Sequence, residues 1–138
     1  MLLAFGFSAT WTRWIMSLIS SPSFSILLNG SPSEPFHPSR GIRQGDPLSP
    51  FLFVLMAEGL SRPLHHAISS HSLKGISLHG LPPTSHQQFA DDTMLFGHPS
   101  VQEASAFKAL LNLFAEASGT SINAAKSQLF FFNTPSVT

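Results

Sequence analysis

The sequence predicts an α+β fold in which an antiparallel sheet, with a carboxylate-bearing β-hairpin, packs against helices. Two kinds of pattern support this: apolar residues recur at helical spacing in three segments, and two turn-forming dipeptides are each flanked by short apolar runs. The 138 residues are 43% hydrophobic and include 13 Phe, which is enough for a packed core. Charged residues make up only 10%, below the roughly 25% usual for soluble domains, so we expect a piece of something larger.

The first helix is expected around Trp11 to Ile19, where apolar residues follow the i, i+3, i+4, i+7, i+8 pattern of one helical face. Ser8 or Thr10 can serve as its N-cap. A strand over Phe24 to Leu28 should then enter a tight hairpin turn, because Asn29-Gly30 favours the positive φ angles that such a turn needs.

A second helix is expected to have Ser49 as N-cap and Pro50 as its first residue, a position where the missing amide hydrogen costs nothing. Its apolar residues point to nearly all sides, which predicts burial over most of its surface. Gly59 or Pro63 should kink or stop it. The Ser-, His-, Gly- and Pro-rich residues 69 to 85 should form the least ordered connection, with residues 75 to 78 as a candidate short strand.

The second hairpin is expected from two short runs, Gln87 to Ala90 and Thr93 to Phe96, which flank Asp91-Asp92. This pattern places both carboxylates at the tip. The apolar residues on either side of the pair predict strands that are buried on both faces.

The third helix should begin with a capping box formed by Ser100 and Glu103 and should end near Gly119. A stripe of apolar residues follows one of its faces: Val101, Ala104, Phe107, Leu111 and Phe114. A last strand is expected at Gln128 to Phe132, where the aromatic run favours a place in the core.

The composition excludes several classes of function and binding site. Seven Lys and Arg balance seven Asp and Glu, whereas a self-sufficient nucleic-acid binder normally has a basic excess, so most of any nucleic-acid grip should lie elsewhere. The absence of cysteine excludes disulfides and thiolate metal sites. The apolar run at 51–57 is far shorter than the roughly 18 residues that a membrane span requires. None of the seven histidines forms a metal-binding motif, and we interpret them as surface or linker residues.

Asp91 and Asp92 are the first candidates for chemistry. Two adjacent carboxylates in a turn lie about 5 to 7 Å apart and repel by roughly 2 to 3 kcal/mol at an effective dielectric constant near 20. Bound Mg²⁺ would offset this repulsion, because it prefers hard oxygen ligands. The alternative is that Asp is a good turn former and that both side chains face water.

The second candidate is the loop from Arg40 to Pro50, which precedes the second helix. Its glycines permit close backbone approach, Arg40 and Arg43 can contact phosphates, and the helix start favours anions. The alternative is an ordinary strand-to-helix loop.

Two motifs, RGIRQGDPLSPFLF at 40–53 and FADDTMLF at 89–96, resemble the reverse transcriptases of LINE-type (non-LTR) retrotransposons, especially those of plants. The segments GF-x6-WI, SFSILLNG and SGTSINAAKS agree in order with that family. The resemblance covers 1–138 as a partial reverse transcriptase domain: a polymerase palm that lacks the upstream catalytic Asp strand, most of the fingers and the thumb.

The resemblance implies roles for single residues. Asp91 would be the main ligand of the catalytic Mg²⁺ ions and Asp92 its lesser partner. Gln44 and Gly45 would lie beside the templating base and the incoming nucleotide. Lys126 falls where related polymerases often carry a lysine near the leaving pyrophosphate, although a solvated lysine before a strand accounts for it nearly as well.

The parent enzyme implied by the resemblance extends a DNA primer on an RNA template with deoxynucleoside triphosphates and Mg²⁺. We expect the isolated chain to be inactive, because two-metal nucleotidyl transfer needs carboxylates on separate strands. Missing N-terminal and C-terminal polymerase segments would be its partners. The alternative is a non-catalytic remnant, or a nucleic-acid or protein interaction module, that keeps the palm core. The neutral net charge favours a remnant, whereas the intact Asp91, Asp92 and Gln44-Gly45 loop favour recent descent from, or truncation of, a working enzyme.

Overall fold

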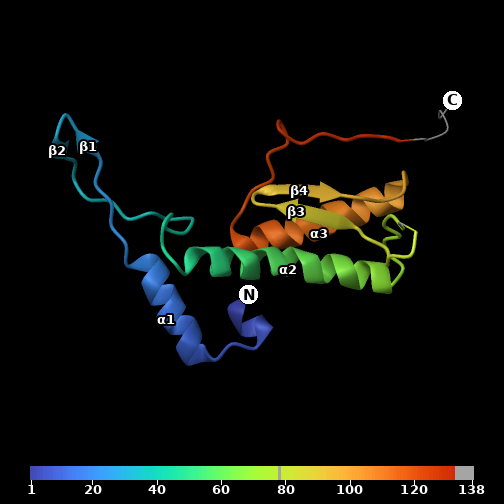
Figure 1. Ribbon diagram of the computed structural model, residues 1–138, viewed down its shortest axis with the longest axis horizontal. Coiled ribbons are helices and arrows are strands. Elements are labelled where there is room, and N and C mark those ends of the chain that lie inside the picture. Colours follow the sequence, from blue (N-terminus) through green and yellow to red (C-terminus); the bar gives the residue numbers. More distant parts are fainter. Residues whose placement is uncertain (78, 133–138) are drawn as a thin grey trace. The chain divides into compact units, whose positions relative to one another are not determined.

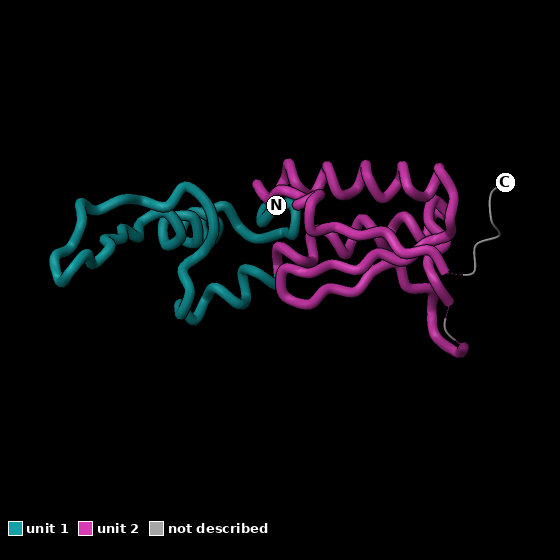
Figure 2. Tube along the Cα trace, turned by 90° about the horizontal axis from the view of Figure 1, so that it is seen from above, with its two compact units in different colours: residues 1–54 teal, residues 55–138 magenta. Residues whose placement is uncertain are grey.

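The computed structural model describes residues 1–77 and 79–132 (Figure 1). The chain divides into two compact units, Met1–Val54 and Leu55–Thr138, with the boundary inside the second α-helix (Figure 2). The elements, in chain order, are η1 (Leu2–Phe5), α1 (Ala9–Ser20), β1 (Leu27–Leu28), β2 (Ser31–Pro32), α2 (Ser49–Ser69), β3 (His86–Phe89), β4 (Asp92–Leu95) and α3 (Val101–Ser118). The α+β class is confirmed, but the described strands form two separate two-stranded antiparallel sheets instead of one sheet.

Helix α1 forms as its periodicity predicts. The Ser8 hydroxyl accepts a hydrogen bond from the Trp11 backbone amide at 3.2 Å, so Ser8 is the N-cap. Ile15 is buried, and the rings of Phe7 and Trp11 stack with their centroids 4.2 Å apart.

The first hairpin turns at Asn29-Gly30, as predicted. Leu28 pairs with Ser31, and Asn29 and Gly30 have φ angles of 48° and 84°, which is the pattern of a type I′ turn. Strand β1 is shorter than the predicted Phe24 to Leu28. The reason is local, because the Ile26 backbone amide donates to the Ser33 hydroxyl at 3.0 Å instead of to a strand partner. Before Ile26, Phe24 forms an isolated bridge with Phe36.

Helix α2 contributes one buried stripe to the core of the second unit, so the predicted burial of most of its surface is wrong. Leu60, Leu64 and Ala67 are buried together with Leu73, whereas Phe51 and Val54, in the first turns of the helix, are exposed. Partly buried residues of β4, α2 and α3 pack on this cluster: Ile68, Leu95, Ala106, Phe107, Leu110, Leu111 and Phe114.

Both ends of α2 differ from prediction. The expected stop at Gly59 or Pro63 does not occur, and the helix continues to Ser69. An internal proline costs about 3 kcal/mol, but each fully buried leucine recovers roughly 1.5 to 3 kcal/mol, and Leu60 and Leu64 lie on either side of Pro63. The predicted N-cap is also wrong, because Ser49 is the first helical residue and its hydroxyl donates to the Arg43 carbonyl at 2.6 Å.

Strands β3 and β4 form the predicted second hairpin, but each begins one residue earlier than expected. Burial on both faces is wrong: Phe89 is 81% exposed and Met94 59%. Only one face is covered, and it carries His86 and Gln88, which are half-buried, together with Leu95. In the preceding connection, Ile76 and Thr84 form an isolated bridge, and Leu78, which ends the candidate strand at 75–78, lies outside the described residues.

Helix α3 begins and ends as predicted, with the Ser100 hydroxyl accepting from the Glu103 amide at 3.2 Å and Gly119 ending it at φ 72°. Only half of the capping box forms. The buried Glu103 carboxylate instead accepts the backbone amides of His98 at 2.9 Å and Lys74 at 3.4 Å. It thereby ties the connection before β3 and the segment after β4 to α3.

The buried stripe of α3 is rotated from the predicted one. Phe107, Leu111 and Phe114 pack on the core as expected, but Val101 and Ala104 are exposed, and Ala106 and Leu110 pack in their place. The first turn of the helix buries Glu103 instead, because its carboxylate satisfies backbone amides of the neighbouring segments.

The predicted last strand is wrong. Residues 128–132 form no ladder, and Leu129, Phe130, Phe131 and Phe132 are exposed. Aromatic side chains favour a strand, but a strand also needs a partner for its backbone hydrogen bonds, and none of the described segments supplies one. Within the described ranges, no helix is both long enough and apolar enough to cross a membrane.

Candidate functional site

The carboxylate pair lies at the end of the β3–β4 hairpin. Phe89 pairs with Asp92, so the two turn residues are Ala90 and Asp91, and Asp92 is the first residue of β4. The prediction of both carboxylates in the turn therefore holds for Asp91 and is wrong by one residue for Asp92. Ala90 has a φ of 51°, a region that suits glycine better than alanine.

The two carboxylates are exposed, and within residues 1–77 and 79–132 neither takes part in a hydrogen bond or an ion pair through its side chain. Side chains alternate along a strand, so Asp92 shares the outer face of the hairpin with Phe89, its pairing partner, and with Met94. The acidic end of the hairpin thus adjoins two exposed apolar side chains.

The donor chemistry of the pair fits a hard divalent cation, since two unpaired carboxylates offer only oxygen ligands. They supply part of a coordination shell. Among the described residues, no three His, Asp or Glu side chains lie close enough together to hold a metal ion. A cation at Asp91 and Asp92 would therefore complete its shell with water or with oxygens of a substrate.

The loop that precedes α2 is held by its own hydrogen bonds. The Asp46 carboxylate accepts the Leu48 amide at 2.8 Å, the Asp46 carbonyl accepts the Ser49 amide at 3.1 Å, and the Ser49 hydroxyl reaches Arg43. These contacts fix the loop end, so Asp46 has a structural role.

Gln44 and Gly45 form an exposed turn within this loop. Gly45 has a φ of 83° with open space around its α-carbon, which leaves the backbone accessible to a ligand. Arg40 and Arg43 line a cavity of about 60 Å³ together with Phe24 and Ile19. This volume is far below the roughly 300 Å³ of small-molecule sites, so a nucleotide could be met only on the open surface of the loop.

Lys126 lies in a single turn that Asn123 organises. The Asn123 carboxamide oxygen accepts the amides of Ala125 and Lys126 at 3.1 and 3.2 Å. Lys126 is exposed, and the strand expected after it is not formed.

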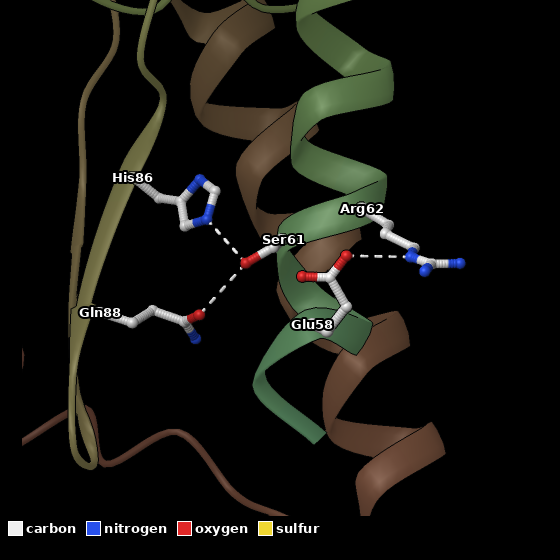
Figure 3. A network of polar contacts seen from close by, with 5 residues as sticks. All are labelled: Glu58, Ser61, Arg62, His86 and Gln88. Atoms are coloured by element: carbon white, nitrogen blue, oxygen red, sulfur yellow. Dashed lines mark hydrogen bonds and ion pairs between the residues drawn. The ribbon is translucent and has the colours of Figure 1, made fainter. Parts of the chain in front are cut away.

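A polar cluster that the sequence did not reveal lies between β3 and α2 (Figure 3). The Ser61 hydroxyl is 2.9 Å from His86 Nε2 and 3.3 Å from Gln88 Oε1. On the other side of the ring, His86 Nδ1 is 3.2 Å from the Ser85 hydroxyl. The interpretation of every histidine as a surface or linker residue is therefore wrong for His86. The signal in the sequence was the alternation His86, Gln88 on one face of a strand, opposite a serine on the buried side of an apolar helix.

The charge of His86 is set by its surroundings. Burial lowers the pKa of His86 below the ordinary value of 6.5, and the nearby His65 adds to this, while Glu58 opposes it. The rings of His65 and His86 meet edge to face at 5.4 Å, and Glu58 pairs with Arg62 at 3.0 Å. His86 is accordingly neutral at pH 7.

The candidate residues fall into two groups. Arg40, Arg43, Gln44 and Gly45 share one loop of the first unit, and Asp91, Asp92 and Lys126 belong to the second unit (Figure 2).

Comparison with known proteins gives one family match over nearly the whole chain. The model of a family described as Reverse transcriptase (RNA-dependent DNA polymerase) matches residues 1–137. No solved structure matches the chain.

Two curated proteins are similar to it. An uncharacterized mitochondrial protein of Arabidopsis thaliana is 47% identical over 68 residues, which cover 49% of this chain and 56% of that protein. The retrovirus-related Pol polyprotein from the type-2 retrotransposable element R2DM of Drosophila melanogaster is 35% identical over 95 residues, 69% of this chain and 8% of the polyprotein. The chain thus spans about half the length of the first relative and a small part of the second.

Proposed function

The chain belongs to the reverse transcriptase (RNA-dependent DNA polymerase) family, and from that premise we propose that it forms part of the palm of a LINE-type enzyme that extends a DNA primer on an RNA template. One observation carries the proposal: two carboxylates with no partner among the described residues stand at the end of a β-hairpin that is packed on the core through its other face. The two negative charges are therefore accessible to a ligand, and the packed hairpin holds them in place.

Members of this family use divalent metal ions, and here Asp91 and Asp92 are the residues that would hold Mg²⁺, with Asp91 as the main ligand. The ion supplies charge stabilisation for phosphoryl oxygens when bound. The two aspartates would orient the ion, because the base of their hairpin packs on the core through Leu95 and contacts α2 through His86. The pairing of Asp92 with Phe89 holds its backbone in the ladder, whereas Asp91 lies at the tip.

The loop before α2 would bind the substrates. Gln44 and Gly45 would lie beside the templating base and the incoming nucleotide, because their turn exposes backbone groups and tolerates close approach. Arg40 and Arg43 would contact phosphates. Lys126, which is exposed, would approach the leaving pyrophosphate.

The proposal is tested by transplanting residues 1–137 into a related full-length LINE-type reverse transcriptase in place of the matching segment. We expect Mg²⁺-dependent primer extension on an RNA template, abolished by Asp91→Ala and reduced less by Asp92→Ala. Glu116→Ala, an exposed carboxylate on α3, is the matched control and should leave extension unchanged.

The purified 138-residue chain should show no extension, since correct positioning of reactants is worth roughly 7 to 11 kcal/mol of barrier and one carboxylate hairpin cannot provide it alone. A folded chimera without activity would contradict the proposal and favour a non-catalytic interaction module.

A further inference from the structure

Ser61 contacts β3 at a position from which it can hold the carboxylate hairpin against α2. Apolar packing holds only the base of the hairpin, where Leu95 joins the core and pairs with His86. Toward the tip, Gln88 is the last residue of β3 on the covered face, because Phe89 is exposed and Ala90 begins the turn. The Ser61 hydroxyl reaches both His86 and Gln88 (Figure 3).

We propose that Ser61 is a positioning residue for the Asp91–Asp92 hairpin, which it fixes on α2 through His86 and Gln88, and that the unbroken chain of hydrogen bonds from Ser85 through His86 and Ser61 to Gln88 requires neutral His86. The consequence for catalysis rests on the polymerase role proposed above. The docking contact itself does not depend on that role.

The direction of the hydrogen bonds follows from what each atom can do. Gln88 Oε1 can only accept, so the single hydroxyl hydrogen of Ser61 is donated to it. His86 Nε2 must then donate to Ser61, which leaves Nδ1 as the acceptor for the Ser85 hydroxyl. The chain of donors runs from Ser85 through His86 and Ser61 to Gln88, and it closes only for the neutral Nε2–H form of His86.

Protonation of His86 breaks this chain at its buried end. A hydrogen on Nδ1 would force the Ser85 hydroxyl to accept instead of donate, and Ser85 is only 1% exposed, so its own hydrogen would lose its partner away from water. The new charge would also face His65, while Glu58, already paired with Arg62, would attract it. The hairpin should therefore loosen as His86 becomes charged.

The test uses the 138-residue chain and two measurements. Long-range ¹H–¹⁵N NMR at pH 7.5 should show the hydrogen of His86 on Nε2; the Nδ1–H tautomer would overturn the proposed direction. Amide hydrogen exchange should show protection of β3 and β4 falling about tenfold in Ser61→Ala, with α3 unaffected. Ser61→Thr, which keeps the hydroxyl, should restore protection.

Ser69→Ala is the matched control, because Ser69 lies on the same helix and, among the described residues, its hydroxyl bonds only to the His65 carbonyl of that helix. Equal effects of Ser61→Ala and Ser69→Ala, or unchanged protection in Ser61→Ala, would overturn the proposal. If Ser61→Ala does not fold, lowering the pH of the unmodified chain decides: β3 and β4 should lose protection as His86 titrates, before α3 does. Simultaneous loss in all three elements would contradict the docking role.

In the active chimera, Ser61→Ala should lower kcat several-fold with little change in the KM for the nucleotide, because the metal ligands are misplaced while the binding loop is untouched. Ser61→Thr should recover kcat. An unmodified chimera that folds but lacks activity would count against the polymerase role alone, and the NMR and exchange results would still decide the docking contact.

Discussion

Phe89 lies directly opposite Asp92 in the β3–β4 ladder, so the turn consists of Ala90 and Asp91 alone. This register is fixed from the base of the hairpin, where the Phe96 amide donates to the Ser85 carbonyl at 2.7 Å and Thr84 forms a bridge with Ile76. The turn accommodates the register by placing Ala90 at a positive φ, and the first prediction follows from that strain.

Replacement of Ala90 should reveal the strain in the turn. The left-handed backbone conformation costs alanine roughly 1 to 2 kcal/mol, and Ala90→Gly removes this cost. Glycine loses more conformational entropy on folding, which is a similar or smaller cost, so the free energy of unfolding should be unchanged or rise by up to about 1 kcal/mol. Ala90→Val should lose about 1 to 2 kcal/mol. Urea unfolding measures both.

The control for this prediction is Ala109, an exposed residue in the interior of α3. There glycine should be the worse substitution, by several tenths of a kcal/mol, because a helix disfavours glycine more than valine. The same ranking of Gly and Val at both positions would contradict strain at Ala90.

The buried Glu103 carboxylate should be a major determinant of stability. Glu103→Ala leaves the amides of His98 and Lys74 without their acceptor and should cost about 2 to 4 kcal/mol in the free energy of unfolding. Glu103→Gln, which keeps an acceptor oxygen, should cost less. Glu116→Ala, on an exposed position of the same helix, should change stability by under about 0.5 kcal/mol. Equal losses for Ala and Gln would exclude the hydrogen-bond explanation.

Leu64 is fully buried at the centre of the second unit, and Leu64→Ala should destabilise it by about 2 to 5 kcal/mol in thermal or urea unfolding. Leu113→Ala is the control, since that side chain is 57% exposed and leaves no cavity. A loss under about 1 kcal/mol at Leu64 would show that this cluster does not form the core in solution.

The free energy of unfolding should decrease as the pH is lowered, because His86 becomes protonated. Its pKa is lowered in the folded state, chiefly by burial, so between that value and the ordinary value of 6.5 the unfolded chain binds more protons than the folded one. The contribution is complete above about pH 6.5 and is lost as pH falls through the lowered pKa. As the pH is lowered from 7.5 to 5, the urea midpoint should decline less steeply in His86→Asn than in the unmodified chain. An unchanged slope in His86→Asn would show that His86 does not cause the pH dependence. His79→Asn, in the exposed connection, should keep the wild-type slope.

Binding of Mg²⁺ by the isolated chain should be weak, in about the millimolar range, because two carboxylates fill only part of the coordination shell. Calorimetry should show this heat reduced by Asp91→Ala and unaffected by Glu116→Ala. Micromolar binding that Asp91→Ala abolishes would mean that further ligands complete the site.

The sequence by itself determined the elements whose signals are local. Ser8 and Ser100 accept backbone amides at their helix starts, Asn29-Gly30 turns the first hairpin, and Gly119 ends α3, because each depends on the conformational or hydrogen-bonding preference of one or two residues. Periodicity located the three helices. The motifs also marked the carboxylate pair and predicted the hairpin that carries it, and the family match agrees with the resemblance stated from them.

Only the tertiary structure decided which surfaces are covered and how strands are aligned. Pro63 remains within a helix because Leu60 and Leu64 on both sides of it are buried, and Phe130 to Phe132 form no strand because no described backbone pairs with them. The Ser61–His86–Gln88 cluster arises from contacts between residues 25 and 27 positions apart in the chain. The shift of Asp92 from the turn into β4 arises from the pairing of β3 with β4. Register and buried polar contacts depend on the partner that each residue meets, and that information is absent from the local pattern of residue types.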